Sequence, residues 1–173
     1  MKSLLLLVSF VAFYSFSNAQ ETATQFKEAE FNEQFAKLTC SGKNDFAELI
    51  DKQVVVNGDT SWKSKLKLPG LKFANFSKSK SMIDYAFVAY QKFPSKDEAN
   101  GYYQLVKQAI NASSGDCIKL EPARIPMGVK GVEQYDLWKS TKNVAYNNRS
   151  NTFLYVSLNL DSENEVVVNV FLR

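Results

Sequence analysis

Two segments of the chain repeat apolar residues at the spacing of an α-helix. The first spacing predicts a helix over about 24–38. The second spacing predicts a helix that begins after Ser95, which forms the sequence pattern of a capping box together with Glu98. The Ser113-Ser114-Gly115 run is expected to end that helix. The apolar positions are Phe31, Phe35 and Leu38 in the first helix, and Ala99, Tyr102, Tyr103, Val106 and Ile110 in the second.

Apolar and polar residues alternate in other segments, as expected for half-buried β-strands. Met82–Phe93 is the strongest of them, and its second face is also partly apolar, which indicates a central position in a sheet. Asp161–Asn164 separates the last two segments and predicts a hairpin, and Asp45–Asp51 is expected to form a short helical turn. The expected strands are 62–68, 71–76, 82–93, 135–141, 143–146, 152–160 and 165–173. These elements predict an α+β fold, with an antiparallel sheet of about 6–8 strands and two main helices packed on one face.

The two halves of the chain, 20–93 and 94–173, resemble each other. Trp62-Lys63-Ser64 lies 22 residues after one cysteine and Trp138-Lys139-Ser140 lies 21 residues after the other. The pattern indicates a possible internal duplication of a helix followed by a meander, and chance agreement of two such segments is the alternative. The arrangement is similar to that of duplicated helix-plus-antiparallel-sheet proteins, such as the secreted β-lactamase inhibitory proteins. The similarity is one of architecture, and no motif of that family can be carried over to residues of this chain.

The first 19 residues have the features of a secretory signal peptide. A short basic start precedes an apolar run over 4–13, and small residues lead to a cleavage site between Ala19 and Gln20. The alternative, a membrane anchor, needs about 20 apolar residues, which is twice the length of this run. We therefore expect a single domain over 20–173, secreted or periplasmic, with no transmembrane segment in the mature chain.

The sequence contains two cysteines and no histidine. In an oxidising compartment, Cys40 and Cys117 are expected to form a disulfide, while two separate buried thiols or a reactive thiol are the alternatives. The lack of histidine excludes histidine-based triads and histidine metal sites. Two Ser-x-x-Lys matches lack the accompanying motifs of serine–lysine enzymes, and the acidic residues around Asp161 fit a solvated turn better than a calcium site. We expect no catalytic residue, metal or cofactor.

Lysines accumulate between Asp59 and Asp84, where there is no acidic residue. Three of them are expected to project from one strand face. With Trp62, Phe73 and Phe76 nearby, the lysines are a candidate contact surface for an acidic polymer, a lipid headgroup or an acidic protein. The alternative is a solvated face that protects a sheet edge. The lysines are Lys63, Lys65, Lys67, Lys72, Lys78 and Lys80.

The loop over Glu121–Gly131 is the second candidate binding element, because its Arg124, Ile125 and Met127 lie beside two prolines and two glycines. Its apolar residues could equally pack beneath the loop. The formal charge of +3 is too small for bulk capture of nucleic acid.

The sequence thus predicts an exported, non-enzymatic binding module whose partner is an unknown protein, an acidic polymer or a small apolar ligand, with no specific nucleic-acid binding. A carrier of a small apolar ligand is the first alternative, and a hydrolase without histidine ranks last.

Overall fold

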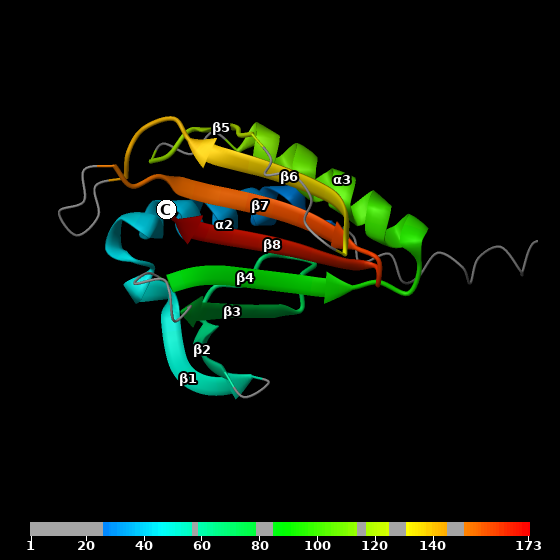
Figure 1. Cartoon of the computed structure of the whole chain (residues 1–173), viewed down its shortest axis with the longest axis horizontal. Helices are drawn as coiled ribbons and strands as arrows, with labels where there is room; N and C mark the ends of the chain where they lie inside the picture. Colours follow the sequence, from blue (N-terminus) through cyan, green and yellow to red (C-terminus); the bar gives the residue numbers. More distant parts are fainter. Residues whose placement is uncertain (1–25, 57–58, 79–84, 114–116, 125–130, 145–150) are drawn as a thin grey trace, which may run out of the picture.

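The computed structural model describes residues 26–56, 59–78, 85–113, 117–124, 131–144 and 151–173. These residues form an α+β fold with two α-helices and eight strands, as the sequence predicts (Figure 1). Two short 3-10 helices, Gly42–Asn44 and Ala47–Leu49, connect the first helix to the first strand. The other elements are α2 (Glu28–Ser41), β1 (Ile50–Val56), β2 (Asp59–Ser64), β3 (Phe73–Lys78), β4 (Tyr85–Lys92), α3 (Lys96–Ala112), β5 (Leu120–Pro122), β6 (Val132–Ser140), β7 (Leu154–Asp161) and β8 (Glu165–Leu172).

All eight strands form one antiparallel sheet in the order β1-β2-β3-β4-β8-β7-β6-β5. Each half of the chain is a helix followed by a four-stranded meander, and the last strands of the two meanders, β4 and β8, pair at the centre of the sheet. The repeated Trp-Lys-Ser triplets end β2 and β6, the second strand of each meander. The topology is therefore symmetric about the β4–β8 pair, and a common origin of the two halves stays a prediction.

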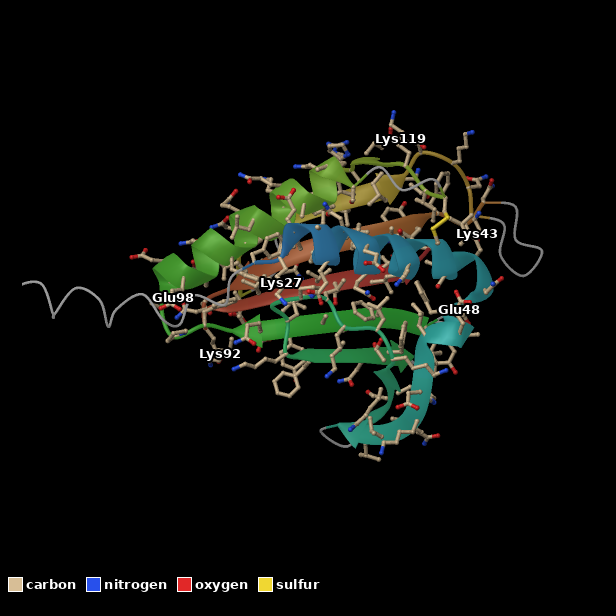
Figure 2. All side chains as sticks on the ribbon, turned by 180° about the vertical axis from the view of Figure 1, so that it is seen from behind. Lys27, Lys43, Glu48, Lys92, Glu98 and Lys119 are labelled. Atoms are coloured by element: carbon tan, nitrogen blue, oxygen red, sulfur yellow. A yellow bond between two sulfur atoms is a disulfide. The ribbon has the colours of Figure 1, made fainter. Side chains whose placement is uncertain are left out.

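Both helices lie on the same face of the sheet, as expected (Figures 1 and 2). The helix α3 follows a strand at the sheet centre and precedes β5 at the edge, so the chain must cross four strand spacings, about 19 Å. Its 17 residues span about 25 Å, which is enough for that crossing. The helix begins at Ser95, whose hydroxyl accepts a hydrogen bond from the Glu98 amide at 3.3 Å and thereby confirms the predicted cap.

The core lies between the helices and the sheet. The apolar stripe of α2 is buried there as the spacing predicts, although the helix begins and ends about three residues later than expected. Burial of such large side chains is the main favourable term in folding. The largest fully buried side chains are Tyr103, Phe31, Phe35, Phe46, Phe76, Phe87, Leu38, Leu68, Ile110, Leu154, Leu158 and Leu160.

Several predicted strand limits are wrong. The strand expected over 62–68 ends at Ser64, because the Ser64 hydroxyl accepts a hydrogen bond from the Leu66 amide at 3.1 Å and turns the chain. Leu66 and Leu68 are still buried, but in an irregular segment. The strands β1 and β5 were not predicted, and Val144 is not in a strand. Residues 145–146 of that expected strand lie outside the described residues.

A disulfide joins Cys40, near the end of α2, to Cys117, just before β5, and confirms the predicted pairing (Figure 2). The two Cα atoms are 5.5 Å apart, an ordinary distance for a disulfide. The bond connects the first half of the chain to the second. Among the described residues, no helix combines the length and the apolar character that crossing a membrane requires.

Candidate binding face

One face of the sheet is covered by both helices, while no described helix covers the other (Figures 1 and 2). We call the second surface the open face. Successive strand residues point to opposite sides of a sheet, so the strand register assigns each residue to one face. On the open face, paired residues form rows that run across the strands.

The central row of the open face is mainly polar. It runs through Asn75 on β3, Val88 on β4, Asn169 on β8 and Ser157 on β7. The Asn169 side-chain amide donates a hydrogen bond to the Ser157 hydroxyl at 3.0 Å. Lys63 of β2 is the next residue of this row and is exposed. Ser157 is only 3% exposed, so the row offers mainly amide groups at the surface, with a positive charge at its outer end.

Two stacked aromatic pairs flank the central row. Phe73 and Tyr90, on β3 and β4, have ring centroids 4.9 Å apart and ring planes 18° from parallel. Tyr155 and Phe171, on β7 and β8, have ring centroids 5.6 Å apart and ring planes 12° from parallel. Phe73 is 53% exposed, so its ring is accessible at the surface of the open face.

The two aromatic pairs are related by the symmetry of the sheet. Val88 pairs with Asn169 at the centre, and Tyr90 and Phe171 each follow two residues later on their own strand. Because β4 and β8 are antiparallel, these two positions lie on opposite sides of the central row. Each carries its stacked partner on the neighbouring strand of the same meander. The open face thus presents similar aromatic groups at two ends of a polar centre.

Charged residues lie at the ends of the open face. At one end, the Lys139 ammonium lies 3.5 Å from the centroid of the Phe153 ring. At the other, Lys92 pairs with Glu163 at 2.8 Å, and this carboxylate raises the pKa of Lys92. Burial, followed by the neighbouring Asp161 carboxylate, raises the pKa of Glu165. Both signs of charge are therefore present at the margin of the face.

The predicted lysine site does not form one strand face. Only Lys63 lies in β2, whereas Lys65, Lys67 and Lys72 are exposed in the irregular segment between β2 and β3. The ammonium of Lys65 donates a hydrogen bond to the Glu48 carbonyl at 3.2 Å. The prediction of one common strand face is wrong because β2 ends at residue 64. Beyond that residue, the alternation of polar and apolar residues no longer sets the direction of the side chains.

The other predicted contact residues are dispersed. Trp62 lies on the helix-covered side, half-buried, with its ring 5.0 Å from that of Tyr85 in an edge-to-face contact, so it does not share a face with Lys63. Arg124 is exposed after β5. Ile125, Met127 and Lys80 lie outside the described residues, as does the side chain of Lys78.

The acidic turn between β7 and β8 has a structural role. One Asp161 carboxylate oxygen accepts hydrogen bonds from the Glu163 and Glu165 amides, both at 2.9 Å, and so holds the hairpin. Within the ranges that the structure describes, no three acidic or cysteine side chains come close enough to bind a metal ion. Ser64 and Lys67, one of the Ser-x-x-Lys matches, belong to a turn rather than to a helix.

Of the aromatic residues of the open face, the sequence places only Phe73 near a candidate contact surface, and it does not identify the two aromatic pairs. The available signal was the second apolar face of the Met82–Phe93 segment, which includes Val88 and Tyr90. That signal correctly indicated a central strand, and β4 is central. Searches against protein-family models, curated proteins and solved structures found no match to this chain.

Proposed function

We propose that this chain is an exported, disulfide-stapled binding module that docks another exported protein on its open face. The observation that carries the proposal is the pair of aromatic stacks on either side of a polar row, on the face opposite both helices. The Cys40–Cys117 bond supports the exported location, because such bonds persist in oxidising compartments.

The residue types of the open face favour a protein partner. Protein interfaces are enriched in aromatic residues relative to the rest of the surface, and their charges lie mainly at the rim. Tyrosine adds rigid contact area at a low entropy cost, and serine and asparagine add adaptable hydrogen bonds. Phe73, Tyr90, Tyr155 and Asn169 supply such groups, and the charged residues lie at the ends of the strands.

The ring geometry and the charge also argue against two other partners. Single-stranded nucleic acid binds by stacking its bases on aromatic faces. In both aromatic pairs of the open face, however, the two rings stack on each other, with ring planes only 18° and 12° from parallel. Each ring therefore already uses one of its faces for the other ring of its pair. An acidic polymer needs a continuous positive surface. The open face has lysines at its margin together with the Asp161 and Glu163 carboxylates.

The packing of the core weighs against the alternative of an apolar-ligand carrier. Such a carrier needs space between the helices and the sheet. Aromatic rings instead contact one another there, with centroid distances of 5.6 Å for Phe31–Phe35, 5.5 Å for Phe46–Phe76 and 5.4 Å for Phe76–Phe87. The carrier therefore ranks below the binding module.

A photo-crosslinking amino acid placed at Tyr90 tests the proposal, with the same group at Gln108 on the exposed surface of α3 as the matched control. In the native host, we expect position 90 to capture one defined protein and position 108 not to capture it. The affinity of the captured protein is then measured for Phe73→Ser and Leu105→Ser. The two side chains are 53% and 44% exposed but lie on opposite sides of the molecule.

We expect Phe73→Ser to weaken binding at least tenfold, because a large exposed aromatic side chain is a typical energetic centre of an interface. Leu105→Ser is expected to change the affinity less than twofold. Equal capture from both positions, or equal loss of affinity in both variants, would show that the open face is not the docking surface.

A further inference from the structure

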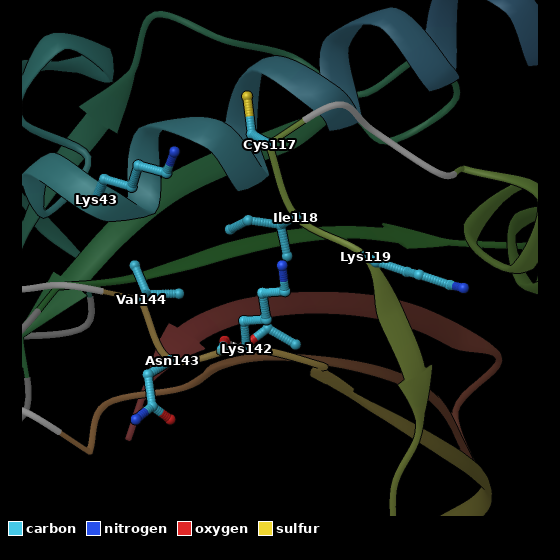
Figure 3. Close-up of a pocket in the computed structure, with 8 residues that line it drawn as sticks. Lys43, Cys117, Ile118, Lys119, Lys142, Asn143 and Val144 are labelled. Carbon is cyan, nitrogen blue, oxygen red and sulfur yellow. Dashed lines mark hydrogen bonds between the residues drawn. The ribbon is translucent and has the colours of Figure 1, made fainter.

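We propose a second, separate site: a pocket beside the disulfide that binds the phosphate or sulfate group of a small organic molecule. The pocket has a volume of about 330 Å³, which falls within the range of small-molecule sites. It is lined by Lys43, Cys117, Ile118, Lys119, Ser140, Lys142, Asn143 and Val144 (Figure 3).

Two lysines define the positive charge of the pocket. Figure 3 shows Lys43, from the 3-10 helix after α2, and Lys142, from the segment after β6, extending toward the space beside Ile118. Lys119 also lines the pocket, and its ammonium extends away from the other two, so it adds charge at the rim. Three lysines from three separate segments therefore line the hollow, and the ammonium of one of them, Lys119, points away from it.

The charge of these lysines is not neutralised by the described residues. The ion pairs that the described part of the chain forms involve Lys27, Lys37, Lys92, Lys96 and Lys107. Within that part of the chain, Lys43, Lys119 and Lys142 have no carboxylate within ion-pair distance. Bringing like charges together without a counterion is unfavourable, and a bound anion would relieve that repulsion.

The fold holds the pocket in place from two sides. The disulfide fixes Cys40, three residues before Lys43, to Cys117, two residues before Lys119. The Ser140 hydroxyl donates a hydrogen bond to the Lys142 carbonyl at 2.8 Å and accepts one from the Leu154 amide at 3.1 Å. The backbone that carries each lysine is therefore anchored, and only the side chains have to adjust to a ligand.

The lining indicates the class of ligand. Lysine acts on phosphate as a point charge, whereas planar recognition of a carboxylate favours arginine. Ammonium groups from separate segments suit a tetrahedral oxyanion ester, because its three terminal oxygens point in different directions and can each accept a hydrogen bond. Ile118 and Val144 are 7% and 4% exposed and supply an apolar part of the wall. A phosphate or sulfate ester with a small apolar group matches both features.

Isothermal titration with phenyl phosphate, phenyl sulfate and inorganic phosphate tests this site. We expect both esters to bind saturably at millimolar concentration or below, and inorganic phosphate to bind more weakly because it lacks the apolar group. The double variant Lys43→Gln/Lys142→Gln is expected to weaken ester binding at least tenfold. The control Lys67→Gln/Lys72→Gln removes the same charge from two other exposed lysines and is expected to change the affinity less than twofold.

Two results would overturn the proposal. Equal weakening in both double variants would mean that net charge alone attracts the anions, and no saturable binding of either ester would mean that the pocket is not an anion site. Because all four lysines are exposed, we expect each variant to keep the thermal midpoint of the parent protein. The binding comparison then reports on the pocket and not on unfolding.

Discussion

Replacing both Cys40 and Cys117 by alanine removes the disulfide, which in the described residues is the only covalent cross-link between the two halves apart from the peptide chain itself. The bond closes a loop with a sequence separation of 77 residues. In the chain-entropy description, a loop of this length restricts the unfolded chain enough to stabilise the fold by about 4.5 kcal/mol. Since small domains are stabilised by about 5–15 kcal/mol in total, we expect this double variant to lose a large part of its stability.

The measurement is urea unfolding followed by tryptophan fluorescence. For a denaturant slope of about 2 kcal/mol per M, the loss corresponds to a shift of the midpoint by about 2 M. Cys40 is half-buried and Cys117 is exposed, so the missing sulfur atoms should leave little empty space in the core.

The parent protein, reduced but otherwise unchanged, is the control, because it lacks the cross-link and retains both side chains. We expect the reduced protein and the double variant to unfold at similar urea concentrations. A difference below about 1 kcal/mol between oxidised and reduced protein would refute the entropic reasoning. It would indicate that the unfolded chain already keeps the two segments close together.

Three further predictions concern the helix-covered side of the sheet. Gly70→Ala should destabilise the protein by about 2 kcal/mol or more, because Gly70 has a φ of +82° and a Cβ there would lie 2.5 Å from Cε2 of Tyr102. Gly131→Ala is the control in the same urea assay, because Gly131 has a φ of +81° but no atom within 4 Å of the added Cβ. It therefore measures the cost of the backbone conformation without the steric clash. Tyr103→Phe should lower the free energy of unfolding, measured with urea, by about 1–2 kcal/mol, because the Tyr103 hydroxyl donates a hydrogen bond to Asp136 at 2.6 Å. An unchanged urea midpoint would contradict this and show that water replaces the lost hydrogen bond. Burial raises the pKa of both Tyr102 and Tyr103 above the ordinary 10.0. As the pH rises, the two hydroxyl groups therefore lose their protons in the unfolded chain before they do so in the folded protein. The free energy of unfolding should then fall above pH 10, by up to about 1.4 kcal/mol per pH unit for each tyrosine. Urea midpoints measured from pH 9 to 12 check this, and a decline no shallower in Tyr103→Phe than in the parent would contradict it.

The features that the sequence predicted well are those set by neighbouring residues. The helix α3 combines a cap at Ser95 with a regular apolar stripe, and both signals act within a few turns. The hairpin between β7 and β8 is similarly local, because Asp161 binds the amides of its own turn. Phe87 and Ala89 share the buried face of β4, as the alternation indicates.

The strand after Trp62 shows why alternation alone can mislead. Leu66 and Leu68 continue the alternating pattern of β2 and are buried, yet the chain has already left the sheet at Ser64. The Lys65 amide donates to the Leu49 carbonyl at 2.8 Å, a contact with a segment that no local pattern could identify. Burial and strand geometry are separate properties, and the sequence reports mainly the first.

The open face could not be assembled from the sequence, because it depends on strand order. Tyr155 and Phe171 become neighbours only through the β7–β8 register, and the second aromatic pair lies opposite them only because β4 joins β8. The second apolar face of β4 predicted a central strand correctly. It did not indicate that the helices would both lie on the opposite side. The sequence instead draws attention to the lysines, because a run of like charge is visible without knowledge of the fold.

The pairing of β4 with β8 has a consequence for how the chain reaches its folded state. β1 to β4 can form their hairpins as soon as they are made, but the inner edge of β4 has no partner until residues 165–172 follow. Until then, a strand with one mainly apolar side presents unpaired amides and carbonyls, which is the condition under which strands join those of other molecules. The last strand to emerge is therefore the one that closes the middle of the sheet. Cutting the chain before Glu165 would remove the centre of the sheet and not its margin, and would leave two half-sheets with exposed edges.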